Sequence, residues 1–240
     1  MTVKWYESNK KLFVEEQDSL TDRYPFLKLE IVPRGTRINK VCILKAEAAI
    51  VSGIHRLYIP ESQRYLDYRI AIILPDNYPR SAPWMYCNDK KLPIGNIDRH
   101  IYGNGSACLG VNAEISQKWQ SSPRIVLFLD DIVAPFLIWQ AYYDEHGQPP
   151  PWGQRSHYAQ GVLEFYAELL QIEVDSTVKD FINLLARKNQ PKGHEMCPCG
   201  SGLRLRSCHF DLVQQVRKKI AWEDVRNDIS LIVNDSKRIF

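Results

Sequence analysis

Residues 65–98 read YLDYRIAIILPDNYPRSAPWMYCNDKKLPIGNID, and this stretch decides the fold class of the chain. Residues 65–74 are rich in aromatic and β-branched side chains, which favours a strand that ends at the turn sequence PDN. Prolines then recur, and a proline inside a helix removes a backbone hydrogen bond and clashes with the preceding turn. These prolines are Pro75, Pro79, Pro83 and Pro93. We therefore expect strand and ordered loop, without a long helix, between residues 74 and 98.

Patterns typical of helices lie on both sides of this strand region. Residues 4–20 carry apolar side chains at near-helical spacing among charged ones, which predicts an amphipathic first helix. Residues 27–51 alternate or bunch their apolar residues as strands do, around a PRG turn. Further helices are expected over residues 123–143, 157–170, 178–186 and 212–225. Because the strands are grouped together, we predict an α+β fold.

Composition and charge limit the class of protein. Of 240 residues, 45% are hydrophobic and 25% are charged, which argues against disordered, collagen-like and membrane proteins. The longest apolar stretches flank Asp130 and Asp131 and are shorter than the roughly 20 residues that a bilayer requires. No secretory leader pattern is visible, so we expect a cytoplasmic location and no membrane partner. The net charge of +3 combines +5 over residues 187–240 with −2 before them, which does not predict nucleic-acid binding.

Cys108 lies in an irregular, glycine-rich segment, HIYGNGSACLG, at residues 100–110. A nucleophilic thiol needs partial exposure, groups that favour the thiolate, and donors that stabilise an oxyanion. Glycine amides, Asn104, His100 and the adjacent Arg99 can supply these groups. The simpler alternative is a buried, inert thiol, because free cysteine is among the most buried residue types.

The order of these motifs resembles the ubiquitin-conjugating enzyme (UBC) family. The sequence YPRSAP at residues 78–83 matches the Tyr-Pro-x-x-x-Pro segment of that family, and GSACL at 105–109 matches its Gly-x-x-Cys-Leu nucleophile site. Trp119 and the later PRI at 123–125 approximate its tryptophan element with a one-residue insertion. The resemblance spans roughly residues 4–145. It implies an N-terminal helix, an antiparallel four-stranded meander, an active-site loop and C-terminal helices.

The resemblance also implies a reaction and its participants. Cys108 would accept the acyl group of a ubiquitin-like protein, or of another protein C-terminus, as a thioester and pass it to an amine. A target protein and an activating enzyme would be the partners. Similarity to UBC-like proteins of bacterial antiphage operons adds a cGAS-like nucleotidyltransferase as a candidate target.

Two residues of the loop receive roles by the same resemblance. His100 occupies the place of the family histidine, which either supports the loop or acts in acid/base chemistry. Ile101 and Tyr102 replace the Pro-Asn that follows it in the family, so the oxyanion-stabilising asparagine has no direct counterpart. Asn104 either substitutes for it or is simply a turn asparagine. His157 is a further candidate for the edge of the site, or a residue at a helix start.

The missing Pro-Asn also supports a second hypothesis. The chain would then be a catalytically inactive UBC-fold adaptor that binds proteins and carries a zinc docking motif. The retained Gly105, Cys108 and Leu109 favour the enzyme over the adaptor.

A second cluster of cysteines has metal-ligand spacing. Residues 197–209 read CPCGSGLRLRSCH, so a Cys-x-Cys pair precedes a Cys-His pair across a glycine-containing loop. Three cysteines and one histidine provide four ligands, the number that tetrahedral Zn²⁺ needs in a closed structural site. The predicted ligands are Cys197, Cys199, Cys208 and His209. The stretch closely resembles the SEC-C motif, a small zinc module at the end of the translocation ATPase SecA and of many bacterial proteins.

The sequence therefore predicts two parts joined by a linker. Residues 1–186 form the UBC-like domain, 187–194 the linker, and 195–240 the zinc motif with a C-terminal helix. Cys42 and Cys87 are interpreted as buried thiols.

Other charged and aromatic residues receive ordinary interpretations. Arg99, Lys118 and the RKK run at 217–219 are interpreted as solvated charges, and for the RKK run the alternative is docking to an acidic protein or RNA. Trp119 is interpreted as a core or lid aromatic.

Overall fold

The computed structural model describes residues 4–60, 63–121, 123–152, 155–156 and 158–236. The chain divides into two compact units. The first unit comprises Met1–Leu109 and Lys118–Gly153, and the second comprises Gly110–Gln117 and Gln154–Phe240. His157 lies outside the described residues.

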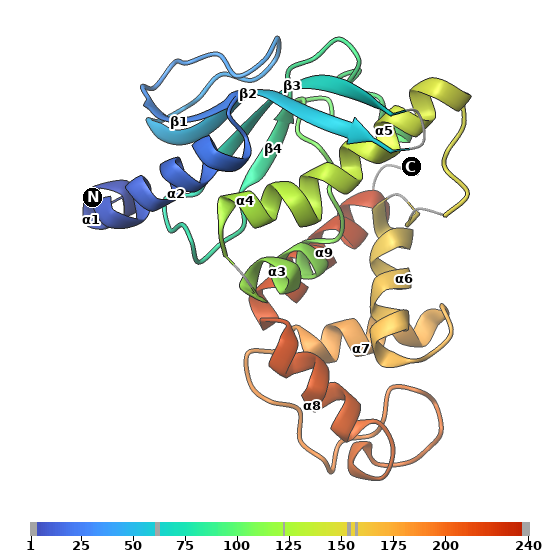
Figure 1. Cartoon of the computed structure of the whole chain (residues 1–240). Helices are drawn as coiled ribbons and strands as arrows, with labels where there is room; N and C mark the ends of the chain where they lie inside the picture. The colour runs from blue at the N-terminus through green and yellow to red at the C-terminus, as the bar shows by residue number, and fades with distance from the viewer. Residues whose placement is uncertain (1–3, 61–62, 122, 153–154, 157, 237–240) are drawn as a thin grey trace. The chain divides into compact units, whose positions relative to one another are not determined.

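The first unit contains a four-stranded antiparallel sheet in the order β1-β2-β3-β4 (Figure 1). Leu29, Val51, Ile72 and Met85 lie opposite one another in successive strands, and each is at most 3% exposed. This row forms the buried face of the sheet, as the alternation of apolar residues requires. The strands are β1 (Leu27–Val32), β2 (Ala48–Ile59), β3 (Arg64–Leu74) and β4 (Trp84–Cys87). The predicted α+β class and the meander are thereby confirmed.

Helices of the first unit cover the buried face of the sheet. The N-terminal helix is split into two, and α2 packs on β1 while α5 packs on β2. The helices are α1 (Trp5–Ser8), α2 (Lys10–Arg23), α4 (Ile125–Phe128) and α5 (Ala134–His146), with a π-helical segment at Leu129–Val133 between the last two. Trp119 is 2% exposed and donates from Nε1 to the carbonyl of Pro79 at 2.7 Å, so it is a core aromatic.

Glu16 of α2 joins three segments of the first unit. Its side chain is fully buried, accepts a hydrogen bond from the Tyr78 hydroxyl at 2.6 Å, and accepts another from the Ile125 backbone amide at 3.2 Å. Arg124 lies 3.4 Å from the same carboxylate. A buried carboxylate is tolerated only with such partners, so Glu16 fixes α2 against the proline-rich loop and the start of α4.

The continuous helical segment Ile125–His146 is the one stretch of the described chain that is long and apolar enough to cross a membrane by length and composition alone. More than half of its most apolar part, 56%, is buried within the structure. Asp130 within it is paired with Arg23 at 2.9 Å and with the Tyr24 hydroxyl at 2.5 Å. A core helix of a folded unit has these properties.

The opposite face of the sheet is partly covered by residues 33–47. Ile38 of this segment is 5% exposed and packs with Ile50 and Ala71. Asn39 is 4% exposed, donates to the Cys87 carbonyl, and accepts from the amides of residues 41 and 42. The segment is therefore held on the sheet by both apolar contact and hydrogen bonds.

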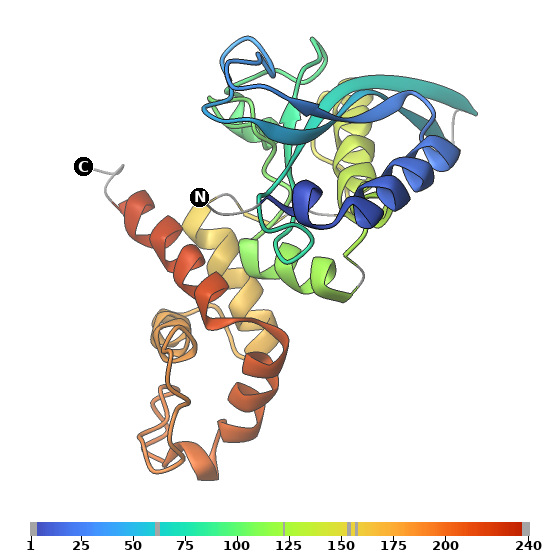
Figure 2. The same cartoon turned by 90° about the vertical axis from the view of Figure 1, so that its left-hand side faces the viewer.

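The second unit is helical. Helix α6 (Tyr158–Leu170) and helix α9 (Trp222–Ser236) run side by side (Figure 2), and α7 (Ser176–Leu185) and α8 (Phe210–Lys219) pack with them. One hydrophobic cluster joins these helices, and it contains Val178 and Phe181 before residue 186 as well as Val213 and Val216 after it. The boundary that the sequence suggested at residue 186 thus falls within a continuous core of the second unit.

Two charged residues of the second unit are structural rather than solvated. Arg217 donates to the carbonyls of Leu185 at 2.8 Å and of Arg187 at 2.7 Å, and so caps the C-terminus of α7. Asp228 is fully buried and accepts hydrogen bonds from the amide of Ala113 and from the Tyr166 hydroxyl. It thereby caps the start of α3 (Asn112–Ser121), a helix that the sequence patterns did not predict.

Candidate functional site

The segment that carries Cys108 is tied to the edge of the sheet. Ala107 donates its amide to the carbonyl of Met85 at 2.9 Å, and Gly105 accepts from the amide of Cys87 at 2.8 Å. On its other side the segment pairs with residues 100–102, through the bridge between Ile101 and Ala107. Residues 105–107 are therefore held between β4 and residues 100–102, and Cys108 follows directly at the end of this short ladder.

Cys108 and His100 are joined through their backbones. The Cys108 amide donates to the His100 carbonyl at 2.8 Å, and the thiol residue is half-buried. His100 has a left-handed conformation with φ +53°, which costs a residue other than glycine roughly 1–2 kcal/mol. In many acyl-transfer enzymes the amide of the nucleophile is an oxyanion donor. Here the Cys108 amide already donates to the His100 carbonyl, so it cannot donate to an oxyanion while this hydrogen bond is made.

Asn104 lies in the same loop, with its side chain exposed. Its Oδ1 accepts hydrogen bonds from the Ser106 amide at 3.0 Å and from the Ser106 hydroxyl at 2.7 Å. This arrangement closes a turn, in which Gly105 is the left-handed residue with φ +80°. The structure thus brings the three sequence-predicted loop residues into one segment and gives the carbonyl of Asn104 a turn-forming role.

Arg99 is not a solvated charge, which corrects the interpretation from sequence. Its side chain is only 8% exposed, its Nε donates to Gln140 Oε1 at 2.7 Å, and its Nη2 lies 2.8 Å from Asp144 Oδ1. Gln140 in turn donates from Nε2 to the Arg99 carbonyl at 2.8 Å. The guanidinium also lies over the Tyr143 ring, 4.6 Å from its centroid. Its partners on α5 are 41 or more residues distant, so no local pattern could reveal its burial.

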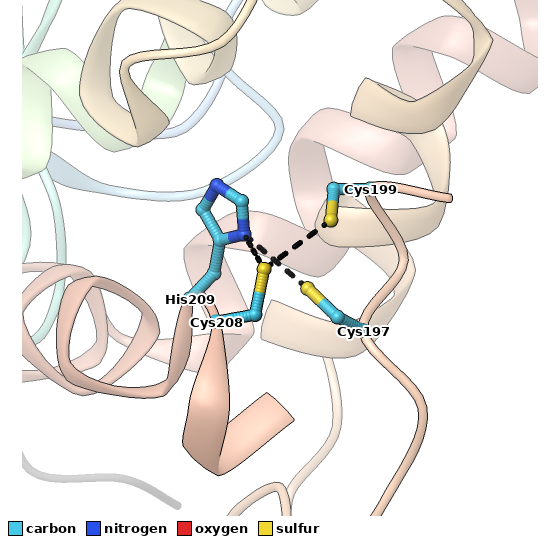
Figure 3. A group of neighbouring side chains, drawn as sticks. All are labelled: Cys197, Cys199, Cys208 and His209. Carbon is cyan, nitrogen blue, oxygen red and sulfur yellow. Dashed lines mark hydrogen bonds between the residues drawn. The ribbon is translucent and has the colours of Figure 1, made fainter. Parts of the chain in front are cut away.

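The four predicted metal ligands converge in the second unit (Figure 3). Their ligand atoms all lie within 4.8 Å of one another. Nδ1 of His209 is 3.3 Å from the Cys197 sulfur and 3.1 Å from the Cys208 sulfur, and Cys199 and Cys208 are 3.4 Å apart. In a tetrahedral zinc site with Zn–S bonds of about 2.3 Å, the ligand atoms are separated by about 3.8 Å. The cluster can therefore bind a metal such as zinc.

The local fold of residues 195–209 explains this convergence. Cys197 donates its amide to the Leu203 carbonyl at 2.9 Å, which closes the loop that carries Cys199. Gly200 and Gly202 in this loop have φ of +76° and +73°, conformations that glycine adopts without a Cβ clash. Cys208 follows the 3-10 turn Leu205–Ser207, and His209 directly precedes α8, so the second pair of residues lies between that turn and the helix.

Two of the thiols differ in how readily they form the thiolate that binds a metal ion. Burial raises the pKa of Cys197 to about 12. Burial also acts against ionisation of Cys199, but hydrogen bonds, chiefly with Ser201, lower the pKa of that thiol to about 6. Because the thiolate is the ligand form, the Cys199 sulfur is ready to bind, whereas at Cys197 the cation must displace the proton.

No protein-family model matches this chain, and no curated protein shows significant similarity to it.

Proposed function

We propose that this protein is a ubiquitin-conjugating-like acyltransferase with Cys108 as its nucleophile. The observation that carries the proposal is the position of Cys108, which is half-buried at the end of a hydrogen-bonded ladder beside the last strand of an antiparallel meander. A thiol on a rigid loop, accessible in part, suits nucleophilic attack better than a thiol sealed in the core. Cys87, which is fully buried and whose pKa burial raises to about 12, has the opposite environment.

The reaction consists of two acyl transfers. In the first, the Cys108 sulfur attacks the carbonyl carbon of the donor thioester, the bond to the donor sulfur breaks, and the Cys108 proton leaves with the departing thiol. In the second, an amine attacks the new thioester, an amide bond forms, and Cys108 is released as the thiol. The donor is a ubiquitin-like protein or another protein C-terminus, supplied by an activating enzyme. A cGAS-like nucleotidyltransferase is the candidate target, and the location is cytoplasmic.

Two loop residues have distinct roles in this proposal. His100 supports the loop, because its carbonyl holds the Cys108 amide and its ring lies edge-on against Trp139, 5.3 Å between centroids. Asn104 is the candidate oxyanion donor through its amide nitrogen, since its oxygen is engaged with Ser106. One hydrogen-bond donor to an oxyanion is worth about 3 kcal/mol of transition-state stabilisation.

The cysteine cluster of the second unit would hold structural Zn²⁺. Its ligands would be Cys197, Cys199, Cys208 and His209, a closed set without a position for substrate. The ion would stabilise the fold of residues 195–209 and take no part in the acyl transfer. The exposed Met196 and Leu203 beside it, 61% and 49% exposed, would serve partner docking.

The second candidate is a catalytically inactive adaptor with the same fold and the same zinc motif. One observation favours it, namely that the Cys108 amide, a potential oxyanion donor, is engaged by the His100 carbonyl within the loop. An adaptor would need no free oxyanion donor.

Peptide-level mass spectrometry after alkylation distinguishes these candidates. The enzyme requires rapid iodoacetamide labelling of Cys108 at neutral pH and, with a glycyl-peptide thioester, a Cys108 adduct that hydroxylamine cleaves. Cys108→Ala must lose the adduct, whereas Cys42→Ala must keep it. An inert Cys108 that takes up neither reagent would contradict the enzyme and favour the adaptor.

A further inference from the structure

We infer that Arg99 is a positioning residue for Cys108, acting through His100 from its attachment to α5. The inference rests on the proposed function, because it concerns the same thiol. Arg99 itself is buried, does not belong to the motifs that suggested the reaction, and makes hydrogen bonds through both its side chain and its backbone carbonyl.

Arg99 and α5 donate hydrogen bonds to each other. The guanidinium binds the side chains of Gln140 and Asp144, at 2.7 Å and 2.8 Å, while the Gln140 amide returns a hydrogen bond to the Arg99 carbonyl at 2.8 Å. The Tyr143 ring lies against the guanidinium on the same helix. Gln140, Tyr143 and Asp144 share one helical face by their spacing. Arg99 is thus fixed in position and in orientation at once.

The orientation of Arg99 determines that of its neighbour. Arg99 ends a 3-10 turn whose start is capped by Asn96, and His100 follows in the left-handed conformation. Because the peptide group between Arg99 and His100 includes the carbonyl that Gln140 holds, the direction of the chain at His100 is set from α5. The next carbonyl, that of His100, then accepts the Cys108 amide.

The Arg99 attachment should affect the rate of acyl transfer to Cys108 more than it affects the exposure of the thiol. Attack on a thioester requires a nucleophile in a defined orientation, and small displacements of the reacting atoms reduce the rate strongly. Alkylation by a small reagent makes no such demand. Loss of the Arg99 attachment should therefore slow acyl transfer to Cys108 and leave its alkylation nearly unchanged.

The first test is amide hydrogen exchange measured by NMR on the full chain, in wild type and in Arg99→Met. We expect exchange of the Cys108 amide to accelerate at least tenfold, while the Ala107 amide, which binds Met85 of β4, stays within twofold. The matched control is Arg56→Met, which removes an exposed bidentate pair with Asp67 from the same unit and should leave both amides unchanged. Equal acceleration at Ala107 and Cys108 in Arg99→Met would overturn the inference.

The second test is acyl transfer from the glycyl-peptide thioester, with iodoacetamide labelling in parallel. Arg99→Met should lower the acyl-transfer rate at Cys108 at least tenfold and change the labelling rate less than twofold. Gln140→Glu, which keeps the acceptor for Arg99 Nε and loses the donor to its carbonyl, provides a milder variant that should lower acyl transfer to a smaller extent. Unchanged acyl transfer in both variants overturns the inference and leaves the proposed function intact, whereas a wild-type Cys108 without acyl transfer overturns the proposed function itself.

Discussion

The ring of Phe181 lies edge-on against the ring of His209, with 5.2 Å between their centroids. Phe181 is fully buried in the core of the second unit, and His209 is a metal-ligand candidate. Cys197, another candidate ligand, is 6% exposed within the same hydrophobic cluster, and Leu205 between the two pairs of candidate ligands is fully buried. The cluster of ligands is therefore continuous with the core that α7 and α8 form.

Removal of the metal should consequently destabilise the helical core formed by α7 and α8 as well as the loop that carries the ligands. We expect one zinc ion per chain by elemental analysis, and a loss of helical circular dichroism when a strong chelator removes it. Because the metal binds the folded chain and not the unfolded one, its binding free energy adds to the free energy of unfolding. The midpoint of thermal unfolding should therefore depend on the metal. Cys208→Ser should reproduce the chelator effect, and Cys42→Ser in the first unit should not. Identical melting of metal-free and metal-loaded protein would contradict this prediction.

The stability of the first unit should increase with pH because of His55. This imidazole is 2% exposed, and burial lowers its pKa from 6.5 to about 4, against the opposing effect of Asp130. The unfolded chain therefore binds a proton more readily between those values. The contribution to stability is complete above pH 6.5 and is lost as the pH falls towards 4. A difference of about 2.5 pH units corresponds to about 3 kcal/mol at most.

Hydrogen exchange of β2 amides between pH 4 and 7, corrected for intrinsic rates, measures this effect. His55→Leu should flatten the pH dependence, and His146→Gln, which changes an exposed imidazole, should not. A wild-type β2 whose stability is constant over this range would exclude His55 as its source.

The second unit should respond to pH in the opposite direction because of Asp228. Burial raises the pKa of this carboxyl group from 3.8 to about 6, despite the hydrogen bonds from Tyr166 and from the start of α3. Its contribution to stability is present below pH 3.8 and is lost as the pH rises through 6, again about 3 kcal/mol at most. Exchange of α9 amides should therefore accelerate from pH 4 to 6, beyond the intrinsic rate. Asp228→Asn should remove this dependence while Asp211→Asn, at an exposed position, keeps it.

Local signals explain what could be predicted from the sequence. The aromatic and β-branched side chains at residues 65–74 and the prolines after them identify strand and loop from local sequence alone, and β3 ends at Leu74. The four residues that could bind a metal lie within residues 197–209, so their convergence needs only the loop and turn that lead to the start of α8. Both predictions were correct because the deciding contacts are close in sequence.

Distant contacts explain what was missed. Helix α3 has a weak pattern of its own, and its N-terminal amides are satisfied by Asp228, 115 and 116 residues away. Arg99 is buried by Gln140 and Asp144, and Arg217 caps carbonyls some 30 residues before it. Local sequence does not indicate which distant partner a charged side chain will have in the folded chain. Local patterns therefore could not predict α3, the burial of Arg99 or the capping by Arg217.

The last prediction concerns Gly105, where the loop of Cys108 meets the segment that covers the sheet. A Cβ built on Gly105 would lie 2.2 Å from Nδ2 of Asn39, and the glycine has φ +80°, which is strained for any other residue. Asn39 is buried and has little freedom to retreat, because the same nitrogen donates to the Cys87 carbonyl at 3.1 Å. We expect Gly105→Ala to lower the free energy of unfolding by about 2–3 kcal/mol.

Gly103→Ala is the matched control, since a Cβ there meets no atom within 4 Å and the glycine is two positions away in the same loop. Urea unfolding should place this variant within about 0.5 kcal/mol of wild type, as for an ordinary surface substitution. The same variant also connects stability with chemistry, because Gly105→Ala displaces the ladder that carries Cys108 and should also lower acyl transfer from the peptide thioester. Equal unfolding free energies for the two variants would show that Asn39 and Gly105 do not hold the loop against the sheet.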